Sequence, residues 1–233
     1  MIWMQSVITH TMNPDKPLKI GAVLLAAGEG SRMGSVPKSL LRLQGIPLIH
    51  RHLTALREIS FDDIVVVTGY HHEQIEAAIS DQAVRWVRNP EPQRGQQSSI
   101  RLGVAALDAG LDVVMVVLAD QPLIGAYELT ELINAFTQRP TATGVLYPVV
   151  LGQRGNPVVF SGEVIATMLR SGNEADFRRY IDEHPAVVYR YETSNEHFII
   201  DLDTAEDIAA FEQRTGWALS WSDISVKRNT EKP

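Results

Sequence analysis

A glycine-rich loop near the start of the chain carries the residues most able to do chemistry. Residues 24–38 read LLAAGEGSRMGSVPK, in which an apolar run ends at Gly28 and two further glycines follow. Glycines let a backbone approach a ligand closely and turn its N–H groups toward an anion. Arg32 and Lys38 place positive charge beside those groups. The segment therefore predicts a polyphosphate-binding loop and nucleotide chemistry.

Two widespread phosphate loops fit this segment poorly. A Walker A loop needs a Gly-Lys pair, and the chain contains none. The dinucleotide fingerprint G-x-G-x-x-G nearly fits, but its third glycine, Gly34, comes one residue late. That fingerprint also needs an acid at the end of the second strand. The second strand expected here, residues 64–68, continues into Gly69-Tyr70 without one.

Asp120 is the leading candidate for a metal ligand. It follows the apolar run 113–118 and Ala119. Pro122, two residues later, marks the end of the strand. Ligands of open α/β sheets bind outside the carboxyl ends of the strands, where the glycine loop also lies. Mg²⁺ prefers one or two carboxylates together with phosphate oxygens and water. A lone acid there can also cap a helix or a turn, but the neighbouring phosphate loop favours the metal.

Residues 200–207, IDLDTAED, offer a second carboxylate. An Asp-x-Asp motif also carries the nucleophile of haloacid-dehalogenase-type phosphatases. That motif requires Thr or Val where this chain has Ala205, and it usually lies at the start of a domain. In a purely structural role, Asp203 or Thr204 caps the following helix, and Glu206 and Asp207 favour its positive N-terminus. The structural role and the metal role stay open together, for different residues.

The loop pattern A-A-G-x-G-S-R-M-G-x-x-P-K resembles the signature loop of nucleotidyltransferases of the NTP-transferase superfamily. Within it, the chain looks most like the molybdenum cofactor cytidylyltransferase and guanylyltransferase group, from about Ile20 to Phe211. The resemblance implies a Mg²⁺ cofactor. Asp120 lies in a segment similar to the family's L-x-D-x-P motif, and a D-x-D-T-x-x-D end supplies Asp203, with Asp201 as second choice.

The same resemblance implies the roles of the nucleotide contacts. Lys38 lies at the α-phosphate and Arg32 at the β- and γ-phosphates, so that these two and Asp120 form the catalytic set. Gly95 with Ser98 or Ser99 contacts the nucleobase, although plain helix capping fits the serines as well. The full set of expected nucleotide contacts is Ala26, Ala27, Gly28, Gly30, Ser31, Arg32, Met33, Gly34, Lys38, Thr68, Gly95, Ser98 and Ser99.

The expected reaction moves a CMP group from CTP to the phosphate of molybdopterin and releases pyrophosphate. Ala27 favours CTP, because the resemblance pairs A-A-G with cytidine and A-G-G with guanosine. Gly155, Asn156 and Pro157 resemble the acceptor-side motif. The alternatives are a guanylyltransferase that uses GTP, a cytidylyltransferase for a polyol or sugar phosphate, and a nucleotide-binding chaperone that delivers the cofactor. A molybdenum hydroxylase apoenzyme is the expected protein partner.

Four histidines are expected to be solvated or to cap helices. They occur as His50 with His52 and as the pair His71 and His72. Neither group has a carboxylate at the spacing of a metal site.

Strands and helices alternate along the chain, which predicts an α/β fold with a single doubly wound, mostly parallel sheet. The second half adds short strands. We expect an N-terminal extension that frays at 1–17, a Rossmann-like nucleotidyltransferase domain at 18–215 and an irregular tail at 216–233. The expected strands are 20–26, 64–68, 84–88, 113–118, 144–150, 156–160 and 186–191, with 198–201 returning to the α/β style. The expected helices are 47–58, 73–80, 97–108, 126–137, 174–183 and 204–214.

Composition narrows the class of protein. The chain has 233 residues, 45% of them hydrophobic and 21% charged, which is ordinary for one globular domain. A net charge of −7 argues against a nucleic-acid surface, and the absence of cysteine excludes disulfides and thiolate metal sites. No apolar run approaches the length of a membrane span, and no signal peptide is recognisable. We expect a cytoplasmic protein without membrane or nucleic-acid partners.

Overall fold

One mixed β-sheet organises the molecule, and the computed structural model describes residues 17–170 and 176–221 of it. Seven strands follow the order β10-β7-β9-β6-β1-β4-β5, and β8 pairs with β7. Only β9 and β8 run antiparallel to their neighbours. The predicted α/β class and mostly parallel sheet are confirmed. The bounds are β1 Ile20–Ala26, β4 Asp63–Thr68, β5 Arg85–Arg88, β6 Val113–Leu118, β7 Val145–Val150, β8 Gln153–Arg154, β9 Val158–Ser161 and β10 Val188–Glu192.

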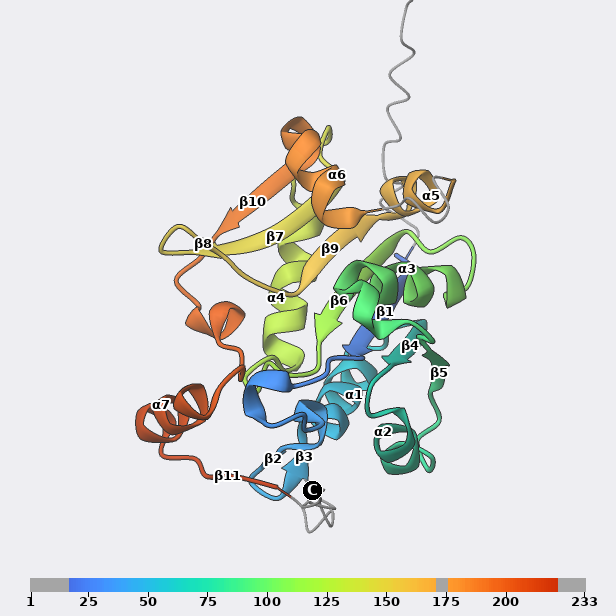
Figure 1. Cartoon of the computed structure of the whole chain (residues 1–233). Helices are drawn as coiled ribbons and strands as arrows, with labels where there is room; N and C mark the ends of the chain where they lie inside the picture. Colours follow the sequence, from blue (N-terminus) through green and yellow to red (C-terminus); the bar gives the residue numbers. More distant parts are fainter. Residues whose placement is uncertain (1–16, 171–175, 222–233) are drawn as a thin grey trace, which may run out of the picture.

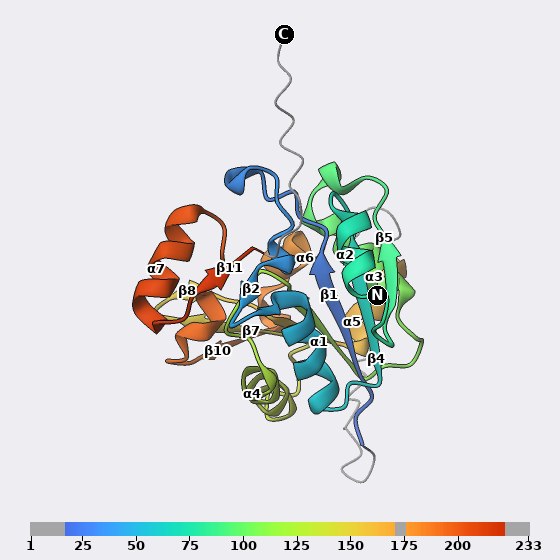
Figure 2. The ribbon, with the colours of Figure 1, turned by 90° about the horizontal axis from the view of Figure 1, so that it is seen from below.

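Helices cover both faces of this sheet, as Figures 1 and 2 show. On one face lie α1 (Leu48–Glu58), α2 (His72–Ala78) and α4 (Ala126–Thr137), and α1 and α4 are side by side. The other face carries α3 (Gln96–Ala106), α5 (Gly162–Arg170) and α6 (Phe177–Glu183). Because both faces are covered, the central strands β1 and β6 are apolar along almost their whole length.

A third, smaller apolar cluster joins distant parts of the chain. Leu41, Leu43 and Leu48 follow the glycine loop, and they pack against Leu202 and Phe211 near the C-terminal end. The cluster lies under a small antiparallel sheet of the order β11-β2-β3 and under α7. This packing holds the segment before α7 opposite the segment before β2. The bounds are β2 Arg42–Leu43, β3 Ile46–Pro47, α7 Ala205–Thr215 and β11 Leu219–Ser220.

Several elements differ from the sequence-based expectations. Helix α5 was not expected, and neither were the two-residue strands β2, β3, β8 and β11, which are too short to show a periodic pattern. Residues 198–201 form no strand, because a 3₁₀ turn spans Glu196–Ile199. Strand β11 lies in the segment 216–233 that was expected to be irregular. The frayed extension expected at 1–17 lies, except for Pro17, outside the described residues, as does the start of the helix expected at 174–183.

In the part of the chain that the structure describes, none of the helices combines the length and the apolar character that a membrane crossing requires.

Candidate active site

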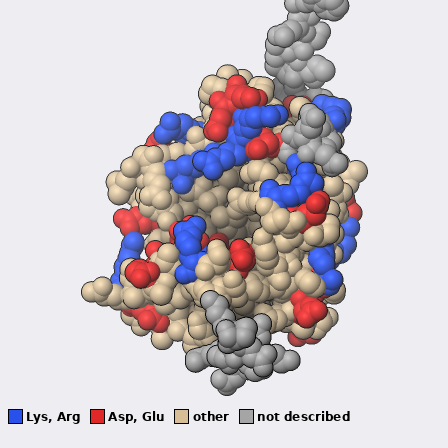
Figure 3. All heavy atoms as spheres, in the orientation of Figure 1, with Lys and Arg blue, Asp and Glu red and all other residues tan. Residues whose placement is uncertain are grey.

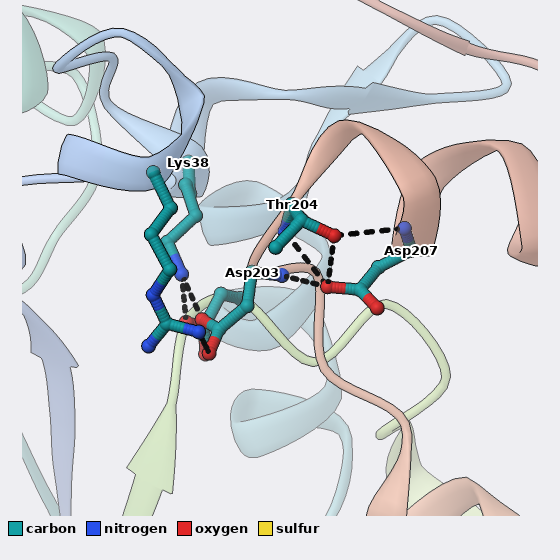
Figure 4. A network of polar contacts seen from close by, with 6 residues as sticks. Lys38, Asp203, Thr204 and Asp207 are labelled. Carbon is teal, nitrogen blue, oxygen red and sulfur yellow. Dashed lines mark hydrogen bonds and ion pairs between the residues drawn. The ribbon is translucent and has the colours of Figure 1, made fainter.

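Four side chains expected to do chemistry meet at the carboxyl edge of the sheet. Nζ of Lys38 lies 2.9 Å from Oδ2 of Asp120 and 2.6 Å from Oδ1 of Asp203. Nη1 of Arg32 lies 2.9 Å from Oδ2 of Asp203. Figure 4 shows Lys38, from the turn that follows the glycine loop, and Asp203, from the segment before α7, pointing toward one another. We call these four residues the charged cluster.

Burial and charge act in opposite directions on this cluster. Burial alone would lower the pKa of Lys38, but the carboxylates of Asp120 and Asp203 outweigh it and raise that pKa above its usual value. Burial likewise opposes ionisation of Asp203, yet hydrogen bonds and charge from Lys38 and Arg32 hold its pKa below the usual value. The ammonium and this carboxylate therefore stay charged at neutral pH.

Asp203 is positioned by a helix cap that was itself predicted. The hydroxyl of Thr204 accepts a hydrogen bond from the backbone N–H of Asp207. Oδ2 of Asp207 accepts bonds from the backbone N–H groups of Asp203 and Thr204, at 3.0 and 2.7 Å (Figure 4). Capping thus falls to Thr204 and Asp207, which leaves the carboxylate of Asp203 to Lys38 and Arg32. Nearby, desolvation and the negative charges of Asp203 and Asp120 raise the pKa of Asp201.

The arrangement of carboxylates suits a cation that also binds phosphate. Oxygens of Asp120 and Asp203 converge on one point, which the ammonium of Lys38 holds. Among the described residues, no group of three or more His, Cys, Asp or Glu side chains is arranged to hold a metal ion by itself. Two carboxylates would leave the remaining positions of Mg²⁺ for phosphate oxygens and water, as this ion prefers.

The glycine loop turns back on itself after β1. Gly30 has a φ of +66°, and a Cβ there would lie 2.2 Å from the carbonyl oxygen of Val36, so only glycine fits. The N–H groups of Met33 and Gly34 donate within the loop, to the carbonyl oxygens of Gly30 and Ser31. Within the described chain no acceptor is recorded for the N–H groups of residues 28–32, so these are the donors available to an anion.

Two serines in the first turn of α3 lie in a buried network with the loop before the helix. Nδ2 of Asn89 donates to the hydroxyls of Ser98 and Ser99, at 2.8 and 2.9 Å, and the Ser98 hydroxyl donates to the carbonyl oxygen of Gly95. We call Asn89, Ser98 and Ser99 the neutral cluster. A cavity of about 390 Å³ runs beside α3 to α5 and α6, and of the expected site residues only Ser98 lines it. The role of Asn89 was not recognised from the sequence.

Thr68 lies at the expected edge, but its side chain faces inward. It is fully buried at the end of β4, and its hydroxyl donates to Glu76 at 2.7 Å. Glu76 in turn pairs with Arg88. The hydroxyl is therefore engaged within the protein.

The expected acceptor motif is joined directly to the loop of Asp120. A Cβ on Gly155 would lie 2.5 Å from the carbonyl oxygen of Phe198, and that oxygen accepts bonds from the N–H of Asn156 and from Nε2 of Gln121. Gly155 precedes β9, which runs antiparallel to β6, so the motif lies at the carboxyl edge.

Of the four histidines, His52 departs from the expectation of solvated or capping side chains. His71 reaches the glycine loop, since its Nε2 lies 2.7 Å from the carbonyl oxygen of Glu29. His52 is 1% exposed, and neither of its ring nitrogens has a hydrogen-bond partner among the described residues. Burial and the charge of Arg51 lower the pKa of His52 to about 4, so its ring is neutral. Spacing alone could not show that this position faces the core.

Comparisons with known proteins place this chain in a family. Residues 22–188 match the MobA-like NTP transferase domain, so the chain belongs to that family and is a nucleotidyltransferase. The bifunctional protein GlmU of Acidovorax sp. (strain JS42) is 34% identical over 170 residues, which are 69% of this chain and 35% of that protein. GlmU of Syntrophomonas wolfei is 35% identical over 55% of this chain and 28% of its own length. The chain thus spans roughly a third of these curated relatives.

Solved structures share the fold over most of the chain. A nucleotidyl transferase from Methanothermobacter thermautotroptrophicus superposes with a TM-score of 0.66 at 25% identity, over 84% of this chain and 97% of that one. Rv0371c from Mycobacterium tuberculosis gives a TM-score of 0.71 at 22% identity, over 85% and 99%. Rv0371c has also been solved in complex with manganese, at a TM-score of 0.65 and 20% identity over 84% and 98%. The family match of residues 22–188 confirms the predicted membership of the NTP-transferase superfamily.

Proposed function

We propose that this nucleotidyltransferase moves CMP from CTP to the phosphate of a pterin cofactor of the molybdopterin type. The observation that carries the transfer is the charged cluster, in which two carboxylates and two cations meet beside a glycine loop with free N–H groups. The choice of CTP and of the pterin rests on the resemblance of A-A-G, A-D-Q-P and G-N-P to the cytidylyltransferase branch.

The proposed reaction needs no general base. An oxygen of the acceptor phosphate, already anionic at neutral pH, attacks the α-phosphorus of the nucleotide. The bond from that phosphorus to the bridging oxygen breaks, and pyrophosphate leaves with the electron pair. The chain aligns the two anions and stabilises charge: Lys38 at the α-phosphate, Arg32 with the N–H groups of residues 28–32 at the β- and γ-phosphates.

The proposed metal is Mg²⁺, held by Asp120 and Asp203, with Asp201 as the second choice. When bound, the ion would neutralise phosphate charge in the transfer. In the structure, Lys38 pairs with both carboxylates and Arg32 with that of Asp203, so each cation has to exchange a carboxylate for a phosphate when substrate arrives.

We attribute the proposed preference for CTP over GTP to the contact between Ala27 and Gly69. A Cβ on Gly69 would lie 2.7 Å from the carbonyl oxygen of Ala27 and 2.9 Å from its Cβ, so the two segments touch without room to spare. Ala27→Gly would loosen this contact and is expected to lower the preference for CTP over GTP.

Pyrophosphate release from purified protein tests the proposal. CTP and GTP are compared with molybdopterin and with methylerythritol phosphate as acceptors, in the presence of Mg²⁺. We expect release with CTP and molybdopterin above all other pairs. Preference for GTP would overturn the base assignment, and preference for methylerythritol phosphate would overturn the acceptor. Binding of each nucleotide alone is measured by the rise in unfolding temperature, because a ligand of the folded state stabilises it.

A cytidylyltransferase for a polyol phosphate is the second candidate. A 4-diphosphocytidyl-2C-methyl-D-erythritol synthase from Anaerococcus prevotii shares the fold, with a TM-score of 0.64 at 18% identity. If the nucleotide binds but no pyrophosphate is released with either acceptor, the third possibility, a chaperone that delivers the cofactor, is favoured. The proposed partner of such a chaperone is a molybdenum hydroxylase.

A further inference from the structure

Two arginines outside the charged cluster, Arg154 and Arg178, lie close enough for their charges to interact, and Arg154 adjoins the expected acceptor motif. Arg154 ends β8, directly before Gly155, and Arg178 lies in the first turn of α6. Both residues are exposed. Figure 3 shows a hollow in this face of the molecule, with Lys and Arg side chains gathered along its upper rim, over α6 and β8.

The topology brings this pair to the same edge as the charged cluster. Strands β6 and β7 both pair antiparallel with β9, so they run in the same direction and their carboxyl ends share an edge. Asp120 follows β6, and the hairpin to β8 follows β7. The backbone N–H of Asn156, two residues after Arg154, shares the carbonyl oxygen of Phe198 with Gln121. The position of Arg154 is therefore tied to the loop of Asp120.

A hydrogen bond joins helix α6 to α3, on the nucleotide side of the same edge. The backbone N–H of Phe177 donates to Oε1 of Gln97 in the first turn of α3, at 2.9 Å. Arg178 is the next residue along the chain. Arg178 thus lies near the segment expected to hold the base, and Arg154 adjoins the segment expected to hold the acceptor.

The surroundings of Arg154 leave its charge in need of an anion. Its guanidinium carbon lies 4.4 Å from the centre of the Tyr147 ring, within reach of a cation–π interaction. Although the residue is exposed, surrounding protein desolvates the guanidinium and lowers its pKa, and the charge of Arg178 adds to this while Tyr147 and Asp182 oppose it. Among the described residues, neither Arg154 nor Arg178 has a carboxylate within ion-pair distance.

Other arginines of the same region are already paired. Arg179, the next residue of α6, lies 3.8 Å from Glu183, and Arg190 of β10 lies 3.9 Å from Glu192. A planar guanidinium presents two parallel N–H donors that match the oxygens of a phosphate. Two such groups without carboxylate partners suit a dianionic phosphate monoester better than a single carboxylate.

We infer that Arg154 and Arg178 form an anion site that holds the phosphate of the acceptor before it attacks the nucleotide. This inference rests on the proposed function, since it assigns the acceptor's place in the proposed site. The pair selects acceptors that carry a phosphate monoester, and it acts on acceptor binding while the nucleotide is held elsewhere.

Steady-state kinetics with the full chain test the assignment. Arg154→Gln and Arg178→Gln are each expected to raise the KM for the acceptor about tenfold or more, because each removes a charged hydrogen-bond partner. The KM for the nucleotide should stay within about twofold. Arg179→Gln is the matched control, since it removes one positive charge from the same helix, and it should leave both KM values unchanged. A rise in the KM for the nucleotide, or equal effects of Arg179→Gln, would overturn the inference.

Direct binding separates this inference from the proposed function. Methyl phosphate is titrated without nucleotide while the arginine Nε–H resonances are followed by NMR, and succinate serves as the dicarboxylate comparison. We expect two resonances to shift with methyl phosphate, one lost in each variant. Binding of methyl phosphate without pyrophosphate release from any acceptor would keep the site and reject the proposed function. Turnover at wild-type KM in both variants, or a stronger response to succinate, would reject the site.

Discussion

The charged cluster and the neutral cluster lie at the same edge of the sheet and are built from opposite kinds of interaction. In the charged cluster, Lys38 and Asp203 are 15% and 29% exposed at their side chains, and every partner is an ion. In the neutral cluster, Asn89 and Ser99 are 5% and 3% exposed, and their bonds are between uncharged groups. The polar atoms of both clusters have partners. Only in the charged cluster are those partners groups that a ligand can replace.

The difference teaches how to separate binding groups from supporting ones. The ion pairs of the charged cluster are partly buried, so the cost of desolvating the charges offsets much of what their attraction adds to stability. A phosphate or a metal ion can therefore take over one partner at small cost. A buried amide that loses its hydroxyl partners leaves unsatisfied groups, which costs far more. We accordingly expect the charged cluster to govern activity and the neutral cluster to govern stability.

Asp120→Asn is the strongest test of the charged cluster. The substitution keeps the shape of the side chain but removes the charge that faces Lys38 and the proposed metal. We expect turnover to fall about 10³-fold or more, measured as pyrophosphate release, because charge stabilisation is the main contribution to such a reaction. The unfolding temperature should hardly change. A folded variant with near-normal activity would remove the transfer scheme.

Lys38→Ala should reduce turnover about 10²- to 10³-fold, the usual effect of losing a group that stabilises developing charge. It also removes the ammonium that competes for Asp120 and Asp203. Mg²⁺ without nucleotide should then raise the unfolding temperature of the variant more than that of the wild type. An equal response of both proteins would mean that Lys38 and the metal do not share these carboxylates.

His52 extends the comparison to a buried group that can ionise. Its pKa is about 4 in the folded protein, below its usual 6.5, so the unfolded chain binds its proton first as pH falls. Stability from this residue is complete above about pH 6.5 and decreases toward pH 4, by about 3 kcal/mol in total. Urea unfolding between these pH values should show a weaker decrease in His52→Leu than in the wild type.

His50→Gln is the control for this pH dependence. His50 lies two residues before His52 in α1, is only partly buried and has Nε2 2.8 Å from the carbonyl oxygen of Ala78. Its replacement should leave the acid-side decrease in place. If His50→Gln flattens the curve as much as His52→Leu does, the buried ring is not its source.

Long patterned segments made most of the fold and of the charged cluster predictable from sequence. Strand β1 was expected with the observed bounds, and the ends of parallel strands meet at one edge, so Asp120 could be placed near the glycine loop. The expectation that Lys38, Asp120 and Asp203 gather agrees with the structure. Their roles toward substrate remain proposals.

The rest depended on contacts between segments that no local pattern encodes. Asn89 reads as a residue before a turn, and only the packed loop shows that its amide binds both serines. His52 shares its helix with polar neighbours, so periodicity did not show its burial. Strand β11 exists because residue Leu219 pairs with Leu43 across the small sheet, a long-range contact.

Asn89→Ala is the corresponding test of the neutral cluster. It leaves the buried hydroxyl of Ser99 without the amide donor, and we expect a loss of about 2 kcal/mol in the free energy of unfolding. Turnover at saturating nucleotide should fall less than threefold, which is far below the effect of Asp120→Asn. Ser80→Ala, which removes an exposed hydroxyl bonded to its own turn, is the control and should cost little. A stable variant with a large loss of activity would assign the neutral cluster to binding.

The smallest expected effect concerns the cap that presents Asp203 to the charged cluster. Thr204→Ala removes the hydroxyl that accepts the N–H of Asp207, and losing such a cap costs about 1 kcal/mol. Asp207 still accepts the backbone N–H groups of Asp203 and Thr204, so Asp203 keeps its place and turnover should stay within about twofold. Asp207→Asn weakens those bonds and should raise the Mg²⁺ concentration needed for half-maximal activity. If Thr204→Ala reduces turnover as strongly as Asp207→Asn, the hydroxyl rather than the carboxylate orients Asp203.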